Sequence, residues 1–356
     1  MKKISLNNTQ IVIGELGFNF LSDFLKKENI DNVFIFLDSQ IRKFCLPILL
    51  DYVSELSSSH IVEIDSGETV KTLDTVQEIS LSLLKHKISR NSLIINLGGG
   101  VICDLGGFIA GVIKRGVRFI NIPTNLMSQI DASVGGKVAV NIRHHKNQLG
   151  LFINPEIVLI YPFFNNSLSE KDFISAQAEI LKYGLIADEL LWKLVSKKYD
   201  FKSNLEFLIY HCLKIKISIV KSDFFDFEDR RKLNFGHSIS HAIESVFFNR
   251  KISISHGHAL SVGIICESFL SYKKFQFCKI LLDEIVRGVL SIFPYILLDN
   301  VEDSLILHYL SSDKKNINND FNFTLIKELG VSVVNCKVKE KDIINSLNYY
   351  RGLCQI

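Results

Sequence analysis

Residues 92–104 read SLIINLGGGVICD, an apolar run that passes into three consecutive glycines and ends on an acidic residue. The apolar part has the length and the β-branched content of a buried strand. Glycines let the backbone approach an anionic group closely, and a helix that begins there turns its N–H groups toward the anion. The stretch therefore predicts a strand–turn–helix unit with a candidate phosphate-binding turn.

Similar units lie on both sides of this stretch. Short apolar runs predict further strands at 31–38, 61–65, 117–125 and 157–161. Apolar spacing predicts helices at 72–88 and 107–116. Because strands alternate with helices, we expect a parallel α/β sheet.

The pattern changes after about residue 167. Helices are predicted at 169–195, 205–222, 237–247 and 258–275, and no comparable series of strands follows. We therefore expect an α/β domain over 1–166 and a mostly helical domain over 167–356.

Composition excludes several classes of protein. The chain has 356 residues, of which 47% are hydrophobic and 22% charged, which is too apolar for a disordered protein. No apolar run is long enough to span a bilayer, so no membrane partner is expected. The net charge is +3 without a dense Lys/Arg block, so no nucleic acid is expected. The seven cysteines form no CxxC pair and indicate a reduced, cytoplasmic protein.

The glycine turn by itself does not identify a cofactor. Its pattern is not GxGxxG, and Asp38, the candidate ribose-binding acid, precedes the glycines in the chain rather than following them. A tight structural turn explains the three glycines equally well. Ser66-Gly67-Glu68 and the nearby Lys71 also fit a simple helix start.

Histidines after residue 230 suggest a metal site. His237 and His241 are four residues apart on a predicted helix, so they share a face. His256 begins another helical stretch, and Glu179 lies on an earlier one. One Glu and two His could bind Zn²⁺ and leave a coordination position open for substrate. The same spacing is also common on helix surfaces that bind no metal.

Basic and polar residues gather near these motifs and fit a polyanionic small molecule. They are Asp131, Lys137, Lys146, Asn147, Lys182, Arg230 and Asn234. Taken singly, most lysines in a protein are simply solvated.

The motifs together resemble one family. The segments GGGVICDLGGF, KRGVRFINIPTN, SQIDASVGGK, KNQLG, AEILKYGLIAD, RRKLNFGHSISHAIE and SHGHALSVG occur in this order, with SGETVK upstream and SSDKKN downstream. In this combination the chain, roughly from 60 to 330, resembles 3-dehydroquinate synthases of the sugar phosphate cyclase superfamily.

The resemblance implies a fold and a reaction. The fold would be an N-terminal α/β NAD-binding domain with a parallel-rich sheet and a C-terminal, mostly α-helical, metal-binding domain, assembled as a homodimer. The enzyme would be a carbon–oxygen lyase of the shikimate pathway that converts 3-deoxy-arabino-heptulosonate 7-phosphate to 3-dehydroquinate and phosphate. The implied course is transient oxidation by NAD⁺, phosphate elimination, reduction and intramolecular aldol closure. The implied metal is Zn²⁺, with Co²⁺ as a substitute.

Site residues carry over motif by motif. The implied metal ligands are Glu179, His237 and His256. His241 would move a proton instead of binding metal. The implied substrate contacts are Asp131, Lys137, Lys146, Asn147, Lys182, Lys216, Arg230 and Asn234.

Further residues carry over to the phosphate and the cofactor. Arg115 would reach the substrate phosphate in the partner subunit, and Lys314 or Lys315 would complete the phosphate site. The implied NAD⁺ contacts are Asp38, Glu68, Lys71, Gly99, Gly100, Val101, Asp104, Thr124, Asn125, Lys137, Lys146, Phe164 and Ser167. An acid at Asp38 suits a ribose hydroxyl and would repel a 2′-phosphate, so NAD⁺ is expected rather than NADP⁺.

Several positions depart from the family pattern, and alternatives stay open. Val138-Ala139-Val140 before Asn141 is more similar to cyclases of secondary metabolism, of the valiolone or deoxyinosose type, and Asn125 and His258 also depart. Lys216 and Arg230, as a carboxylate pocket, favour the dehydroquinate synthase. A polyol dehydrogenase that depends on NAD and metal, and an inactive paralogue, are the remaining alternatives.

Overall fold

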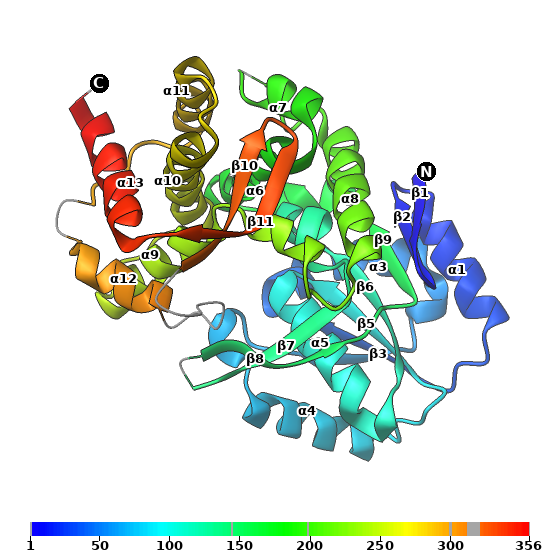
Figure 1. The fold of residues 1–356 in the computed structure, drawn as a ribbon. Coiled ribbons are helices and arrows are strands. Elements are labelled where there is room, and N and C mark those ends of the chain that lie inside the picture. The colour runs from blue at the N-terminus through cyan, green and yellow to red at the C-terminus, as the bar shows by residue number, and fades with distance from the viewer. Residues whose placement is uncertain (1, 144, 198, 299–300, 312–320, 356) are drawn as a thin grey trace. The chain divides into compact units, whose positions relative to one another are not determined.

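The computed structural model describes residues 2–143, 145–197, 199–298, 301–311 and 321–355 (Figure 1). The chain divides into two compact units. Unit 1 contains Met1–Leu168 with Asn204–Ile217, and unit 2 contains Ser169–Ser203 with Ser218–Ile356. Helix α8 (Leu205–Ser222) begins in unit 1 and ends in unit 2.

Unit 1 is built on a seven-stranded sheet in the described part of the chain, in the order β1-β2-β9-β6-β5-β3-β4. All neighbours in it are parallel except the N-terminal pair β1 and β2. The strands are β1 (Lys2–Leu6), β2 (Thr9–Ile13), β3 (Val33–Leu37), β4 (His60–Glu63), β5 (Leu93–Gly98), β6 (Arg118–Pro123) and β9 (Ile157–Ile160). The predicted parallel α/β sheet is confirmed, and the N-terminal hairpin adds two strands that the sequence reasoning had not placed.

Alternation along the strands builds two cores, one on each face of the sheet. Phe34 and Phe36 pack with α4 (Leu73–Lys85), α5 (Gly100–Val112) and the hairpin β7 (Lys137–Ile142) and β8 (His145–Phe152). Ile35 and Leu37 pack on the opposite face. The helices there are α1 (Gly17–Lys27), α2 (Ser39–Phe44) and α3 (Leu46–Tyr52). Strand side chains alternate with a period of two, so one short apolar run serves both layers.

Unit 2 is mostly helical, as predicted. Its helices are α6 (Glu170–Ala187), α7 (Glu189–Val195), α9 (His237–Asn249), α10 (His256–Phe275), α11 (Lys279–Leu290), α12 (Asp303–Ser311) and α13 (Glu340–Gly352). Helix α10 is buried on nearly every side and contacts α6, α9, α11 and α13. The predicted helix 169–195 is two helices, because Asp188 ends α6 and its carboxylate accepts the Leu191 N–H as the N-cap of α7.

The C-terminal part also contains an antiparallel hairpin, β10 (Phe321–Glu328) and β11 (Val331–Val338). None of the described helices is long and apolar enough to cross a membrane.

Candidate functional site

Three side chains of unit 2 converge on one point. Glu179 Oε1 on α6 lies 3.1 Å from His237 Nε2 and 3.3 Å from His256 Nε2. One ligand atom from each residue lies within 4.8 Å of the others. Ligands bound to Zn²⁺ at 2.0–2.2 Å in a tetrahedron lie about 3.3–3.6 Å from one another. The spacing and the Glu-His-His donor set therefore fit a zinc or cobalt ion.

The charges around the cluster favour a cation. Burial raises the pKa of Glu179, but the Lys182 ammonium and His237 outweigh it and hold this pKa well below its usual range. Burial lowers the pKa of His256, but hydrogen bonds to Glu179 and Glu244 raise it to about 10. Positive charge is thus stabilised here, whether a proton or a metal ion supplies it.

The two histidines occupy the first turns of α9 and α10. Gly236 has φ +80° just before α9, and its N–H donates at 2.6 Å to the buried Glu267 carboxylate of α10. Ser255 caps α10 by accepting the His258 N–H. A Cβ at Gly263 would lie 1.9 Å from the Gly236 carbonyl oxygen, so only glycine permits this close approach of α9 and α10.

A buried lysine contacts the cluster, and a buried arginine lies elsewhere in the same unit. Lys182 Nζ lies 2.6 Å from Glu179 Oε2 and donates at 2.8 Å to the Leu233 carbonyl. Arg230 is buried and donates to the Phe224 carbonyl at 2.7 Å. His241, one turn after His237, is exposed, and its ring centroid lies 5.3 Å from that of His237.

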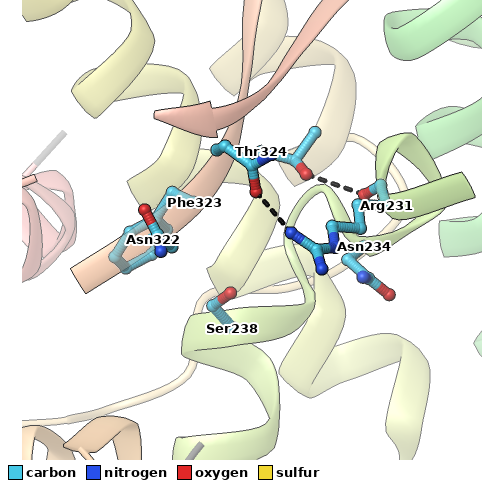
Figure 2. A pocket seen from close by; sticks show the side chains of 7 residues that line it. Arg231, Asn234, Ser238, Asn322, Phe323 and Thr324 are labelled. Atoms are coloured by element: carbon cyan, nitrogen blue, oxygen red, sulfur yellow. Dashed lines mark hydrogen bonds between the residues drawn. The ribbon is translucent and has the colours of Figure 1, made fainter. Parts of the chain in front are cut away.

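Asn234 lines a small hollow in unit 2 (Figure 2). Figure 2 shows Arg231 beside Asn234. The Arg231 guanidinium donates to Asn335, and the Arg231 carbonyl accepts the Thr324 hydroxyl, both at 2.7 Å. The other lining residues are Ser238, Asn322 and Phe323. The C-terminal hairpin thus fixes the segment that carries Arg230 and Asn234.

Unit 1 gathers the predicted cofactor residues at the carboxyl ends of its parallel strands. The strand order reverses between β3 and β5, and ligands of open α/β sheets bind at such a switch point. Asp38 follows β3, and Gly99 and Gly100 follow β5 at the start of α5. One Asp38 oxygen, Oδ1, accepts the Gln40 and Ile41 N–H groups.

A second unit 1 cluster surrounds Lys71, which is 3% exposed. Its ammonium lies 2.7 Å from Asp104 Oδ2 and 2.6 Å from Asn147 Oδ1, with Glu68 at 3.7 Å. Burial raises the pKa of Asp104 to about 6, and the Lys71 ammonium opposes the rise. The structure therefore brings together four residues assigned separately from three motifs.

Hydrogen bonds that involve Thr124 and Asn125 stabilise the turn after β6. Asn125 Oδ1 accepts the Ser128 N–H at 2.9 Å, at the first residue of the π-helical turn Ser128–Ala132. A Cβ at Gly99 would lie 2.5 Å from Asn125 Nδ2. Thr124 is buried beside it, with its N–H bonded to the Gly98 carbonyl at 3.1 Å.

The same π-turn presents Asp131. Its Oδ1 lies 2.6 Å from the ammonium of Lys216, which is 5% exposed. Turns of this kind are rare and often mark functional positions. The pairing fixes Lys216 relative to Asp131 within unit 1.

The remaining predicted residues are more dispersed. Lys137, Lys146, Arg115 and Ser167 are exposed, Val101 lies in the first turn of α5, and the Phe164 ring is buried in the core. Arg115 has φ +60° and follows Lys114 at φ +51°, a strained pair at the tip of a turn. Lys314 and Lys315 lie outside the described residues.

Sequence reasoning missed two supporting residues. Glu244 Oε1 lies 2.8 Å from His256 Nδ1, and the i, i+4, i+7 spacing of His237, His241 and Glu244 could have revealed it. Asn141 donates to Glu68 at 2.9 Å and accepts the Asn147 N–H at 2.8 Å. No local pattern marks the second case.

Known proteins with similar structures share this fold. A 2-deoxy-scyllo-inosose synthase, solved with carbaglucose-6-phosphate, NAD⁺ and Co²⁺, matches with a TM-score of 0.84 and 22% identity over 99% of both chains. A 2-epi-5-epi-valiolone synthase from Streptomyces hygroscopicus subsp. jinggangensis, solved with NAD⁺ and Zn²⁺, matches with a TM-score of 0.83. It is 23% identical and covers 99% of this chain and 98% of its own.

Sequence comparison identifies the family. Residues 61–175 match the family described as 3-dehydroquinate synthase N-terminal, and residues 176–316 match 3-dehydroquinate synthase C-terminal. A 3-dehydroquinate synthase from Parabacteroides distasonis is 35% identical over 93% of this chain and 94% of its own length. Because both domain families match in order and a full-length relative exceeds 30% identity, the chain belongs to the 3-dehydroquinate synthase family.

Proposed function

We propose that the chain is a 3-dehydroquinate synthase that converts 3-deoxy-arabino-heptulosonate 7-phosphate to 3-dehydroquinate and phosphate. One observation carries the proposal. The chain belongs to this family, and one ligand atom each of Glu179, His237 and His256 lies within 4.8 Å of the others. The ammonium of a buried lysine, Lys182, lies 2.6 Å from the same glutamate. A metal site with a fixed ammonium beside it suits a hydroxylated, anionic substrate.

The proposed cofactors are a divalent metal and NAD⁺. When bound, Zn²⁺ or Co²⁺ supplies a Lewis acid for substrate hydroxyls, and NAD⁺ supplies a reversible hydride acceptor. Glu179, His237 and His256 would hold the metal ion. Solved relatives of the same fold contain NAD⁺ with Co²⁺ or with Zn²⁺, which supports the choice.

The chain's own residues would bind and orient the substrate. Lys182, Arg230 and Asn234 lie in unit 2 and offer two cations and an amide for carboxylate and hydroxyl groups. Exposed His241 is suited to moving a proton at a substrate hydroxyl. A positioned set of donors lowers the entropic cost of fixing a flexible dianion.

Unit 1 would bind NAD⁺ at the switch point. Gly99 and Gly100 permit close approach of the pyrophosphate to the α5 N-terminus, and Asp38 keeps one oxygen for a ribose hydroxyl. The same NAD⁺ would also contact Glu68, Lys71 and Asp104, and Asn147 beside Lys71 would face the substrate.

We also propose the assembly and the setting. Arg115 stands at an exposed, strained turn, which supports its predicted reach into a partner subunit of a homodimer. We retain a functional division near residue 166 into a cofactor half and a metal half. Free cysteines, five of them buried, support a reducing, cytoplasmic location.

The test is phosphate release by the full-length protein supplied with Zn²⁺ and NAD⁺. Two substrates are compared, 3-deoxy-arabino-heptulosonate 7-phosphate and sedoheptulose 7-phosphate. Release from the first alone, without net NADH, is the expected result. Release from the second alone would identify a cyclase of secondary metabolism, and NADH accumulation with a polyol would identify a dehydrogenase. No release from either, with both cofactors bound, contradicts the proposal.

A further inference from the structure

The two ring nitrogens of His256 face two different carboxylates. Nε2 lies 3.3 Å from Glu179 Oε1, and Nδ1 lies 2.8 Å from Glu244 Oε1. Glu244 comes from α9, where it lies seven residues after His237 and therefore on the same helix face. Its side chain is 21% exposed, so most of the carboxylate is shielded from water.

The partner of Nδ1 decides what Nε2 can do. When Nδ1 carries the proton and donates it to a carboxylate, Nε2 presents its lone pair, and the ring is both oriented and made more basic. His237 has a different arrangement, because its Nδ1 lies 3.2 Å from the backbone carbonyl of Phe235. The partner of His256 Nδ1 is therefore the Glu244 side chain, which a substitution can remove, whereas the partner of His237 Nδ1 is a backbone carbonyl.

We propose that Glu244 is a positioning residue of the metal centre, whose carboxylate accepts a hydrogen bond from the His256 Nδ1–H and holds Nε2 toward Glu179. This inference rests on the proposed metal site. Glu244 is not among the three residues whose ligand atoms converge, so its role is exerted through His256. A purely structural role, such as bracing α9 against α10, is the alternative that the experiment must separate.

The experiment measures Co²⁺ binding to the full-length protein by competition with a chelator and by the visible absorption of bound Co²⁺. The variants are Glu244→Gln, which keeps the shape and one acceptor oxygen, and Glu244→Ala, which removes the acceptor. The control is Ser245→Ala, since the Ser245 hydroxyl bonds the His241 carbonyl on the same helix. Thermal unfolding without added metal reports on stability.

We expect Glu244→Ala to weaken Co²⁺ binding by about 10- to 100-fold and to change the absorption spectrum. Glu244→Gln should recover part of the affinity, because its amide oxygen still accepts from Nδ1. Ser245→Ala should bind as the wild type does, and the melting temperature of Glu244→Gln should stay unchanged.

Two results would overturn the proposal in distinguishable ways. If the wild type binds Co²⁺ and both Glu244 variants bind it with the same affinity and spectrum, Glu244 has no positioning role, and the metal site stands. If the wild type binds neither Co²⁺ nor Zn²⁺, the metal site itself is wrong and this inference fails with it.

Discussion

Lys182 Nζ lies 2.6 Å from Glu179 Oε2, one turn away on α6, and both side chains are only 2% exposed. The other carboxylate oxygen of Glu179 faces His237 and His256. The two oxygens of the Glu179 carboxylate therefore face different partners. One balances a buried ammonium, and the other remains directed at the candidate metal position.

Removing the ammonium should destabilise unit 2. Lys182→Met leaves the Glu179 carboxylate buried without this cation, so we expect the free energy of unfolding to fall by about 3–5 kcal/mol. Added Zn²⁺ should restore part of this loss, because it binds only the folded cluster. Urea unfolding with and without Zn²⁺ measures both effects. Lys193→Met, at an exposed pair with Glu189, is the control and should cost at most about 1 kcal/mol. Equal losses in the two variants would contradict the argument.

His237 and His241 share a helix but differ in their predicted roles. His237→Ala should lose metal and activity together, since a direct ligand is gone. His241→Ala should retain metal, measured by elemental analysis, and lose turnover. A His237→Ala protein with full zinc content would refute the ligand assignment. A His241→Ala protein without zinc would show that the exposed histidine also ligates.

Arg230 is a buried arginine of unit 2. Arg230→Ala should weaken substrate binding far more than NAD⁺ binding, because its buried guanidinium is the candidate partner of the substrate carboxylate. Arg287→Ala, at an exposed arginine of α11, serves as the control. Calorimetric titration with substrate and with NAD⁺ separates the two effects. Equal weakening of both ligands by Arg230→Ala would argue against a carboxylate role.

Asp38 offers a test of cofactor choice. Asp38→Asn keeps a side chain that can cap α2 but removes the negative charge. We expect NAD⁺ binding to weaken about 10-fold or more, since a charge-assisted hydrogen bond is lost, and discrimination against NADP⁺ to shrink. Binding titrations with both nucleotides give the ratio. An unchanged ratio would place the ribose elsewhere.

The Asp223 carboxyl group makes the free energy of unfolding depend on pH. Burial would raise the pKa of Asp223, but the N–H groups of Phe227, Glu228 and Arg230 hold it below its usual range. The folded chain thus binds this proton less tightly than the unfolded chain. The contribution is complete above about pH 4 and is lost as the pH falls through the lowered pKa.

Asp223→Asn should therefore lower stability at pH 7 by about 1–2 kcal/mol, and the difference from wild type should narrow below about pH 4. Unfolding measured across this range tests the sign. Asp229→Asn, at an exposed pair with Lys232, provides the comparison and should differ little from wild type at either pH. A gap that widens in acid would reverse the assignment.

Periodicity located most of the fold. The apolar run at 92–97 becomes β5, and the runs at 31–38 and 117–125 become its neighbours β3 and β6 in the sheet. Short-range sequence patterns did not locate every element. The hairpin β10–β11 was not predicted, because the pairing of its strands depends on which face unit 2 buries, and no short segment of sequence indicates that face.

In the candidate site, too, the sequence predicted some features and the packing of the helices decided others. Spacing put His237 and His241 on one face of a helix, and family motifs named Glu179 and His256. The convergence of Glu179 with histidines 58 and 77 residues away is a property of how α6, α9 and α10 pack. The same holds for Lys71 with Asp104 and Asn147, and for Glu244 behind His256.

The sequence by itself determined the kind of protein: an α/β half, a helical half and the residue types of a metal and anion site. Tertiary structure alone decided which atoms meet, which oxygen of Glu179 faces Lys182 and which nitrogen of His256 faces Glu244. The reason is physical. Periodicity and turn chemistry act over a few residues along the chain, whereas these contacts depend on helix packing that close approaches such as Gly263 against Gly236 permit.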